Sequence, residues 1–291
     1  MSNLTAGTDI RAAAPVWNWR DGSGEWNLDE LVVEEPLDIR VQGRPISVTM
    51  RTPGHDEELA LGFLLTEKVI SSAADVQHLA AAKSGESADN VIDVQLAPAV
   101  AVDLGRLTRH VFASSSCGLC GKTTIDSVVQ NFPVVTSAVR FAADLIASLP
   151  DRMRALQVTF GRTGGLHAAA LFDAAGNLLV LREDVGRHNA VDKVLGRALL
   201  NGWLPLDRHV LLVSGRSSFE IIQKSVAGGV PIVAAVSAPS SLAVDFATRS
   251  GQTLVGFVRD NRFNVYSHAE RIATGPDPRV SRIAGTPIGV S

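Results

Sequence analysis

The stretch VLLVSGRSSFEIIQKSVAGGVPIVAAVSAPSSLAVDFATRSGQTLVGFV, residues 210–258, decides the fold class of this 291-residue chain. Short apolar runs that predict strands alternate there with amphipathic runs that predict helices, at 210–213, 217–227, 232–236, 241–250 and 254–258. Strands that are apolar on both faces are typical of a sheet covered by helices on both sides. The sequence therefore predicts a three-layer α/β domain with a largely buried sheet.

Outside this stretch, the pattern predicts how the chain is divided. Further strands and helices are expected at 37–41, 46–48, 55–68, 141–149, 167–172, 178–181 and 186–200. The first three of these form a small α+β unit, and the rest extend the α/β unit. We expect four segments: a flexible arm at 1–24, a small α+β domain at 25–112, an α/β domain at 113–272 that begins with a Cys-x-x-Cys loop, and a flexible tail at 273–291.

The composition is that of a globular protein and excludes some classes of partner. Hydrophobic residues make up 46% and charged residues 20%, and the net charge is -3, so neither nucleic acid nor an anionic membrane is expected to be attracted globally. No apolar run approaches the ~20 residues needed to span a bilayer, and the first residues lack the apolar core of a secretion signal. The two cysteines are three positions apart, which favours thiol or metal chemistry in a reducing cytoplasm.

The two thiols, Cys117 and Cys120, lie in a loop of small residues, Ser114–Gly121. Glycine and serine leave the backbone open to an approaching partner. Lys122, next in the chain, and the start of a helix predicted at 123–131 supply positive potential, which lowers a thiol pKa and raises the thiolate fraction. A thiolate is the nucleophile that accepts sulfane sulfur, so we expect sulfur transfer chemistry here.

Other interpretations of the cysteine pair stay open at this point. A zinc site would need one or two further ligands, and a dithiol redox centre usually follows a strand in a thioredoxin-like setting. Two small core residues are a third alternative. A deaminase-like zinc site would use His-x-Glu before Pro-Cys-x-x-Cys; here His268-Ala269-Glu270 follows the cysteines and Ser116 replaces the proline, so the match is weak.

Three loops at predicted strand ends suggest a phosphate site. They are Val213–Ser218, Val185–Asn189 and Gly256–Arg262, and each combines small residues with arginine. Ligands of open α/β sheets gather at the carboxyl ends of strands, and amide groups at helix starts suit phosphate. Taken singly, each loop also has an ordinary explanation, as a helix cap or a solvated turn.

The same blocks carry a resemblance to the formate dehydrogenase accessory sulfurtransferase family. Matching blocks, in the family's order, are Thr52–Gly54 with Glu58–Leu64, Ser116–Gly121, Thr163–Ala169, Glu183–Lys193, Ser214–Ser218 and Thr253–Phe257. A conjunction of ordered blocks is far more specific than Cys-x-x-Cys alone.

The resemblance implies a sulfurtransferase that takes sulfur from a cysteine desulfurase and delivers it to the molybdenum bis-guanine-dinucleotide cofactor of formate dehydrogenase. Cys117 would carry the persulfide, with Cys120 beside it. The cofactor-binding segment would be Phe257, Val258, Arg259, Asp260, Asn261 and Arg262. A homodimer, a larger domain with a cytidine-deaminase fold, and no intrinsic metal are also implied. The alternative is a non-catalytic carrier of the molybdenum cofactor.

Overall fold

A computed structural model of the chain describes residues 10–81, 90–100 and 133–275. Its centre is a six-stranded sheet in the order β13-β12-β11-β10-β8-β9. The strands are β8 (His167–Phe172), β9 (Leu178–Asp184), β10 (Val210–Val213), β11 (Ile232–Ala235), β12 (Thr253–Arg259) and β13 (Arg262–Ser267). β10, β11 and β12 run parallel, and the other strands are antiparallel to their neighbours.

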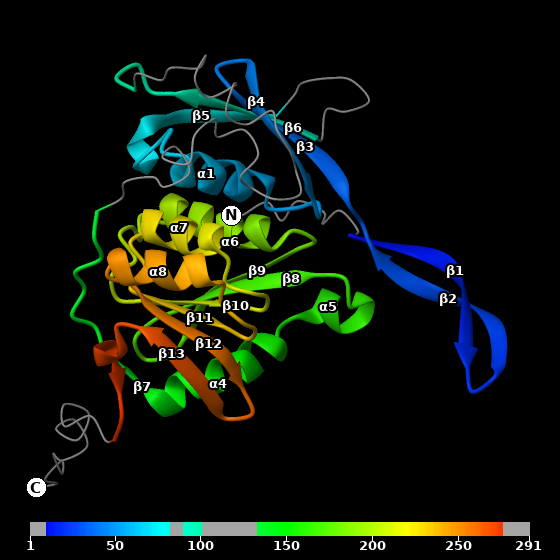
Figure 1. Cartoon of the computed structure of the whole chain (residues 1–291). Coiled ribbons are helices and arrows are strands. Elements are labelled where there is room, and N and C mark those ends of the chain that lie inside the picture. The colour runs from blue at the N-terminus through cyan, green and yellow to red at the C-terminus, as the bar shows by residue number, and fades with distance from the viewer. Residues whose placement is uncertain (1–9, 82–89, 101–132, 276–291) are drawn as a thin grey trace, which may run out of the picture.

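Helices cover both faces of this sheet (Figure 1). One face carries α6 (Arg187–Leu200), α7 (Phe219–Ala227) and α8 (Ser241–Arg249), and the other carries α4 (Ala143–Arg154). Each face has its own hydrophobic cluster, and β10 and β11 are buried along their whole length. The predicted α/β class with a largely buried sheet is confirmed, since both faces of the central strands lie under helices.

A second sheet packs above the first through α1 (Asp56–Thr66). Its order is β4-β3-β6-β5, with strands β3 (Glu35–Val41), β4 (Arg44–Arg51), β5 (Val76–Ala81) and β6 (Val91–Leu96). Two glycines let α1 and α6 approach closely. A methyl group on Gly62 would lie 1.9 Å from the carbonyl oxygen of Asp192, and one on Gly196 would lie 1.8 Å from that of Glu58. Only glycine permits this backbone contact.

Shorter elements complete the described chain. They are η1 (Ala73–Asp75), β7 (Phe141–Ala142), α5 (Val158–Thr163), η3 (Ala269–Arg271) and β14 (Ile272–Ala273). α4 begins two residues later than the expected start at Phe141 and continues through Pro150. The expected domain boundary between residues 112 and 113 and the helix at 123–131 lie outside the described residues.

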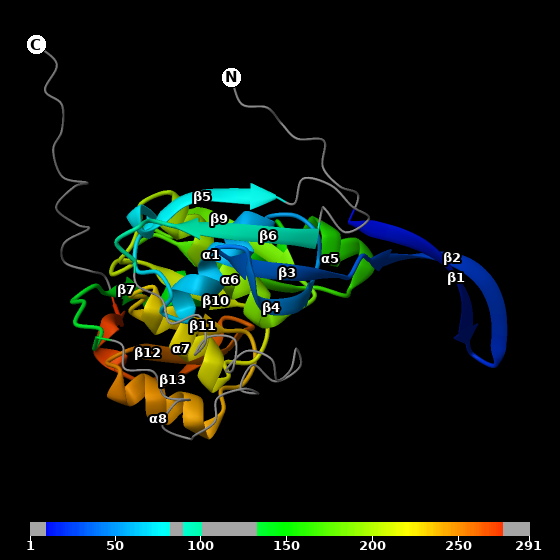
Figure 2. The same cartoon turned by 90° about the horizontal axis from the view of Figure 1, so that it is seen from above.

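The N-terminal segment differs from the flexible arm expected at 1–24. β1 (Arg11–Arg20) and β2 (Ser23–Val32) form a two-stranded antiparallel ribbon that projects away from the body (Figures 1 and 2). Its turn, Asp21-Gly22, has positive φ at both residues, 51° and 86°. That is the geometry for which Asp-Gly is preferred in tight hairpins. The turn signal is present in the sequence, but the alanines that precede it hide the strand.

Candidate functional site

The loops that follow β10, β11 and β12 lie side by side at one edge of the sheet. The amide of Ser217, after β10, donates to the carbonyl of Ala238, after β11, at 3.2 Å. The amide of Phe257, on β12, donates to the carbonyl of Ser237 at 3.1 Å. Because the three strands are parallel, their carboxyl ends must share this edge. The sequence-predicted convergence of these loops is therefore confirmed.

The start of α6 joins the same edge through Gly215. A methyl group on Gly215 would lie 3.3 Å from His167 Nδ1 and 3.9 Å from Arg187 Cδ. The hydroxyl of Ser214 also accepts from the amide of Ala168 at 2.9 Å. We call this edge the strand-end site and define it by His167, Arg187, His188, 214–218, 237–240 and 257–262.

A buried ionic network fixes the α6 side of the strand-end site. Asp184 ends β9 and accepts from the amide of Gly186 at 2.7 Å and from Asn189 Nδ2 at 2.9 Å. Its other oxygen lies 2.7 Å from Lys193 Nζ and accepts from the amide of Thr52 at 3.2 Å. Lys193 in turn donates to the carbonyl of Thr52 at 2.9 Å. Two of the motifs that the sequence singled out thus hold the first turn of α6 in place.

A histidine of α6 and a carboxylate of α7 form a pair at the strand-end site. His188 Nε2 lies 2.8 Å from Glu220 Oε2 and 3.3 Å from Ser218 Oγ. Ser218 occupies the N-cap position of α7, yet its hydroxyl makes no capping hydrogen bond. Ser240, by contrast, caps α8 by accepting from the amide of Ala243 at 3.2 Å. Glu220 was not expected as a site residue, because its partner lies on another helix.

Three buried polar atoms at or beside the strand-end site lack a protein partner in the described chain: Arg187 Nε, Ser217 Oγ and Glu220 Oε1. Buried polar groups are nearly always hydrogen-bonded, so such a cluster calls for a ligand or water. Burial, and then the charges of Arg187 and His188, lower the pKa of His167 from its ordinary value, which favours the neutral ring. The starts of α6 and α7 both point uncapped amide groups at this edge. Such an arrangement can bind an anion with several oxygen atoms.

The segment Phe257–Arg262, expected as a strand-end loop, is the tip of the β12–β13 hairpin. Asp260 and Asn261 form its turn with φ of 53° and 56°, and Phe257 has φ of 56° at a bulge in the pairing. A positive φ is strained for an aromatic residue and is often found where a ligand binds. Arg259 stacks over the Phe257 ring, 5.6 Å from its centroid.

The remaining side chains of this hairpin are placed unequally. Arg262 is exposed and lies 3.7 Å from Asp260. Val258 is fully buried in the hydrophobic cluster beneath α4, so only its backbone faces the edge. Of the six residues expected to bind a cofactor, Phe257 and Arg259 therefore present the best placed surface.

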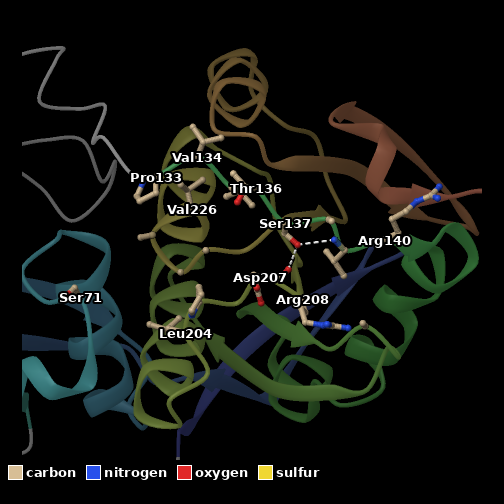
Figure 3. Close-up of a pocket in the computed structure, with 18 residues that line it drawn as sticks. Ser71, Pro133, Val134, Thr136, Ser137, Arg140, Leu204, Asp207, Arg208 and Val226 are labelled. Atoms are coloured by element: carbon tan, nitrogen blue, oxygen red, sulfur yellow. Dashed lines mark hydrogen bonds between the residues drawn. The ribbon is translucent and has the colours of Figure 1, made fainter. Parts of the chain in front are cut away.

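A separate open cavity of about 990 Å³ lies at the opposite end of β10 and β11 (Figure 3). Its lining includes Val134, Arg140, Arg208 and Gly228. Ser137 spans it by donating to the carbonyl of Asp207 and accepting from the amide of Val139. It shares no residue with the strand-end site.

The cysteine loop cannot be placed against either feature, because Cys117, Cys120 and Lys122 lie outside the described residues. His268, weighed above as part of a deaminase-like triplet, pairs with Glu270 at 3.0 Å. Among the described residues, no three metal-binding side chains cluster, and no helix is long and apolar enough to cross a membrane.

Comparison with known proteins gives matches that cover most of the chain. The sequence profile of the FdhD/NarQ family matches residues 32–273. The chain is 54% identical to the sulfur carrier protein FdhD of Streptomyces coelicolor, covering 87% of this chain and 93% of that protein. It is 43% identical to the protein of the same name from Sulfolobus acidocaldarius, covering 87% and 95%.

A solved structure supports the same assignment. A putative formate dehydrogenase accessory protein from Desulfotalea psychrophila superposes with a TM-score of 0.72 at 26% identity, covering 91% of this chain and all of that chain. The two structures share the mixed α/β architecture described above. From profile, relatives and fold together, the chain belongs to the FdhD/NarQ family.

Proposed function

We propose that this protein is a sulfur carrier that matures formate dehydrogenase. Cys117 accepts sulfur from a cysteine desulfurase as a persulfide, and the protein delivers that sulfur to the molybdenum bis-guanine-dinucleotide cofactor bound at the strand-end site. The relatives are named sulfur carrier proteins, and the similar solved structure is named as a formate dehydrogenase accessory protein. A homodimer without an intrinsic metal is part of the proposal.

The observation that carries the proposal is the strand-end site itself. A dinucleotide cofactor presents pyrophosphates and guanine rings. Uncapped helix starts and the unpartnered Nε of Arg187 suit the phosphate oxygens. The Phe257 ring, with Arg259 over it, offers a stacking surface for a base. A protein that only relayed sulfur would have no use for such a site.

The chemistry at Cys117 is a thiol exchange. The Cys117 thiolate attacks the outer sulfur of the donor persulfide, the donor leaves as a thiolate, and Cys117 keeps the transferred sulfur. Cys120, three positions on, can attack the inner sulfur of that persulfide, which forms a Cys117–Cys120 disulfide and releases the outer sulfur as hydrosulfide; a thiol reductant then restores both cysteines. We therefore expect Cys120 to matter more for release than for loading.

The test is intact mass spectrometry after incubation with a cysteine desulfurase and cysteine. Wild type should gain the mass of about one sulfur atom, and dithiothreitol should remove it. Cys117→Ala should gain none, whereas Cys120→Ala should still load. Full loading of Cys117→Ala would contradict the assignment.

The second candidate is a carrier that binds the molybdenum cofactor without transferring sulfur. It is favoured by the same site, because the described anion-binding groups do not require the cysteines. One experiment distinguishes the cofactor carrier from the sulfur carrier. If Cys117→Ala still activates formate dehydrogenase, the carrier is the better description.

A further inference from the structure

The β1–β2 ribbon has one apolar face. Directly opposed residues of an antiparallel pair point to the same side, and the side alternates along each strand. Trp17 pairs with Trp26, Pro15 with Leu28, and Trp19 with Gly24, so all these side chains share one face. We call it the tryptophan face. It holds three of the four tryptophans of the chain.

Most of the tryptophan face is uncovered. Trp17 is 51% exposed, Trp26 72% and Leu28 78%. At the base of the ribbon the same face packs on its own chain. Arg162 Nη2 of α5 contacts Glu30 at 2.6 Å, and a methyl group on Gly165 would lie 3.1 Å from Val32. Toward its turn the ribbon projects away from the body (Figure 2), and in the described chain the three tryptophans and Leu28 are each more than half exposed.

The opposite face of the ribbon carries Leu31, 48% exposed, and Val16, but is polar toward the turn. It carries Asn18, Glu25, Asn27 and Asp29, all exposed. Within residues 11–32 there are four carboxylates and two arginines. Such a negative ribbon is repelled by anionic lipid surfaces. Within that range the tryptophan face has a single carboxylate, Glu30, which Arg162 and Arg11 neutralise at 2.6 and 3.4 Å.

A two-stranded ribbon is only marginally stable by itself in water, so its apolar face needs a partner. A two-fold contact between identical chains brings the same surface together from both sides, so the rings of one copy would meet the rings, Pro15 and Leu28 of the other. The space over Gly24 is already filled by the Trp17 ring of its own chain. Three tryptophans and a leucine at these exposures offer roughly 500 Å². Two copies would bury about 1,000 Å², which reaches the lower limit for a biological interface.

We propose that the tryptophan face packs against the same face of a second copy of this chain. The proposal names the contact surface of the homodimer suggested above and does not depend on sulfur transfer. The outward faces keep their carboxylates in water, so joining the two apolar faces desolvates little charge.

The test uses sedimentation velocity across a dilution series of the full chain. In wild type we expect a dimer. Trp17→Thr/Trp26→Thr keeps a strand-favouring cross-strand pair but removes both rings, and should weaken the dimer at least a hundredfold. The matched control is Val16→Thr/Asn27→Thr, the adjacent opposed pair on the polar face, which should dimerise like wild type. Tryptophan emission should shift to the red as wild type dissociates.

Other outcomes contradict the proposal in distinguishable ways. A wild type that stays monomeric would remove both the dimer and its surface. A dimer that the tryptophan variant leaves intact would place the contact elsewhere. Wild-type binding to neutral lipid vesicles, lost in the variant, would make the face a lipid contact. Loading of Cys117 should be the same in all three proteins, so failure of sulfur transfer would be seen separately.

Discussion

The start of α6 contains two regions that treat buried polar groups in opposite ways. At Asp184 every contact is made: two amides, the Asn189 side chain and Lys193 all lie within 3.2 Å. A few residues on, Arg187 Nε is buried without a partner, and so are Ser217 Oγ and Glu220 Oε1. The same fold therefore satisfies one cluster completely and leaves its neighbour open.

This difference separates scaffold from binding surface. An unpaired buried donor or acceptor costs about 1–3 kcal/mol, so three in one place would be selected against unless something binds them. The Asp184 cluster, in contrast, holds Thr52 and α6 together, because both oxygens of Asp184 and the ammonium of Lys193 already contact groups of the protein itself. We expect substitutions in the first region to reduce stability and substitutions in the second to reduce binding.

The largest expected effect follows removal of Lys193. Lys193→Met leaves the Asp184 carboxylate buried without its cation, which typically costs about 3–5 kcal/mol. Urea unfolding followed by circular dichroism measures the loss. Arg216→Met, at an exposed cation of the strand-end site, is the control and should change stability by less than about 0.5 kcal/mol.

If Lys193→Met does not accumulate as folded protein, Asp184→Asn/Lys193→Met gives the same test. It removes the stranded charge and keeps an acceptor for the Gly186 amide, so stability should recover in part. A loss of under about 1 kcal/mol in the single variant would show that the network contributes little.

A second effect on the scaffold depends on pH and involves Glu58, at the contact of α1 with α6. Burial alone would raise the pKa of Glu58, but hydrogen bonds and charges from Arg182 and His55 outweigh it and lower the pKa from 4.5 to about 2. A lowered carboxyl pKa gives stability that is full above about pH 4.5 and is lost as the pH falls through 2. The shift corresponds to about 3 kcal/mol.

Urea unfolding between pH 7 and pH 2 tests this effect. Glu58→Gln should be less stable than wild type at pH 7, and the gap should close by about pH 2. Glu57→Gln, at an exposed carboxylate one position away, should follow wild type throughout. A gap between wild type and Glu58→Gln that is the same at every pH would mean the glutamate acts by packing alone.

The scaffold was predictable from sequence where local patterns decide it. The run Val210–Val213 is the observed strand β10, and the helix expected at 186–200 is observed at Arg187–Leu200. Apolar strands between amphipathic helices leave few alternatives. The ribbon was missed because Ala12, Ala13 and Ala14 do not favour strands. β13 was missed because its alternation is weak and its exposed residues resemble a turn.

The strand-end site was predictable as a place but not as a set of contacts. Glycine-marked loops after parallel strands had to meet at one edge. The pairing of His188 with Glu220 joins two helices that are about thirty residues apart, and no local pattern encodes it. The presence of an arginine in the sequence does not reveal whether its side chain is buried or exposed. Arg187 and Arg262 therefore seemed equivalent, although only Arg187 has a buried nitrogen without a partner in the described chain.

That contrast gives the last prediction, on binding at the strand-end site. Calorimetric titration with guanosine diphosphate, a surrogate for the dinucleotide cofactor, compares Arg187→Gln with Arg262→Gln. Arg187→Gln should weaken binding by roughly ten- to a hundredfold, because it removes a charge-assisted contact worth about 1.5–3 kcal/mol from a buried position. Arg262 is 71% exposed and already lies 3.7 Å from Asp260, so solvent screens its charge and its loss should weaken binding only about threefold.

The control is Arg249→Gln, at an exposed arginine that pairs with Asp245 in the last turn of α8, and it should bind the nucleotide like wild type. Arg187→Gln should also keep the urea midpoint of wild type, since its guanidinium makes no hydrogen bond or ion pair within the described chain and its Nε is buried without a partner there. Equal affinities for Arg187→Gln and wild type would mean that the open cluster is filled by water alone, while a stronger loss at Arg262 than at Arg187 would move the phosphates outward to the hairpin tip.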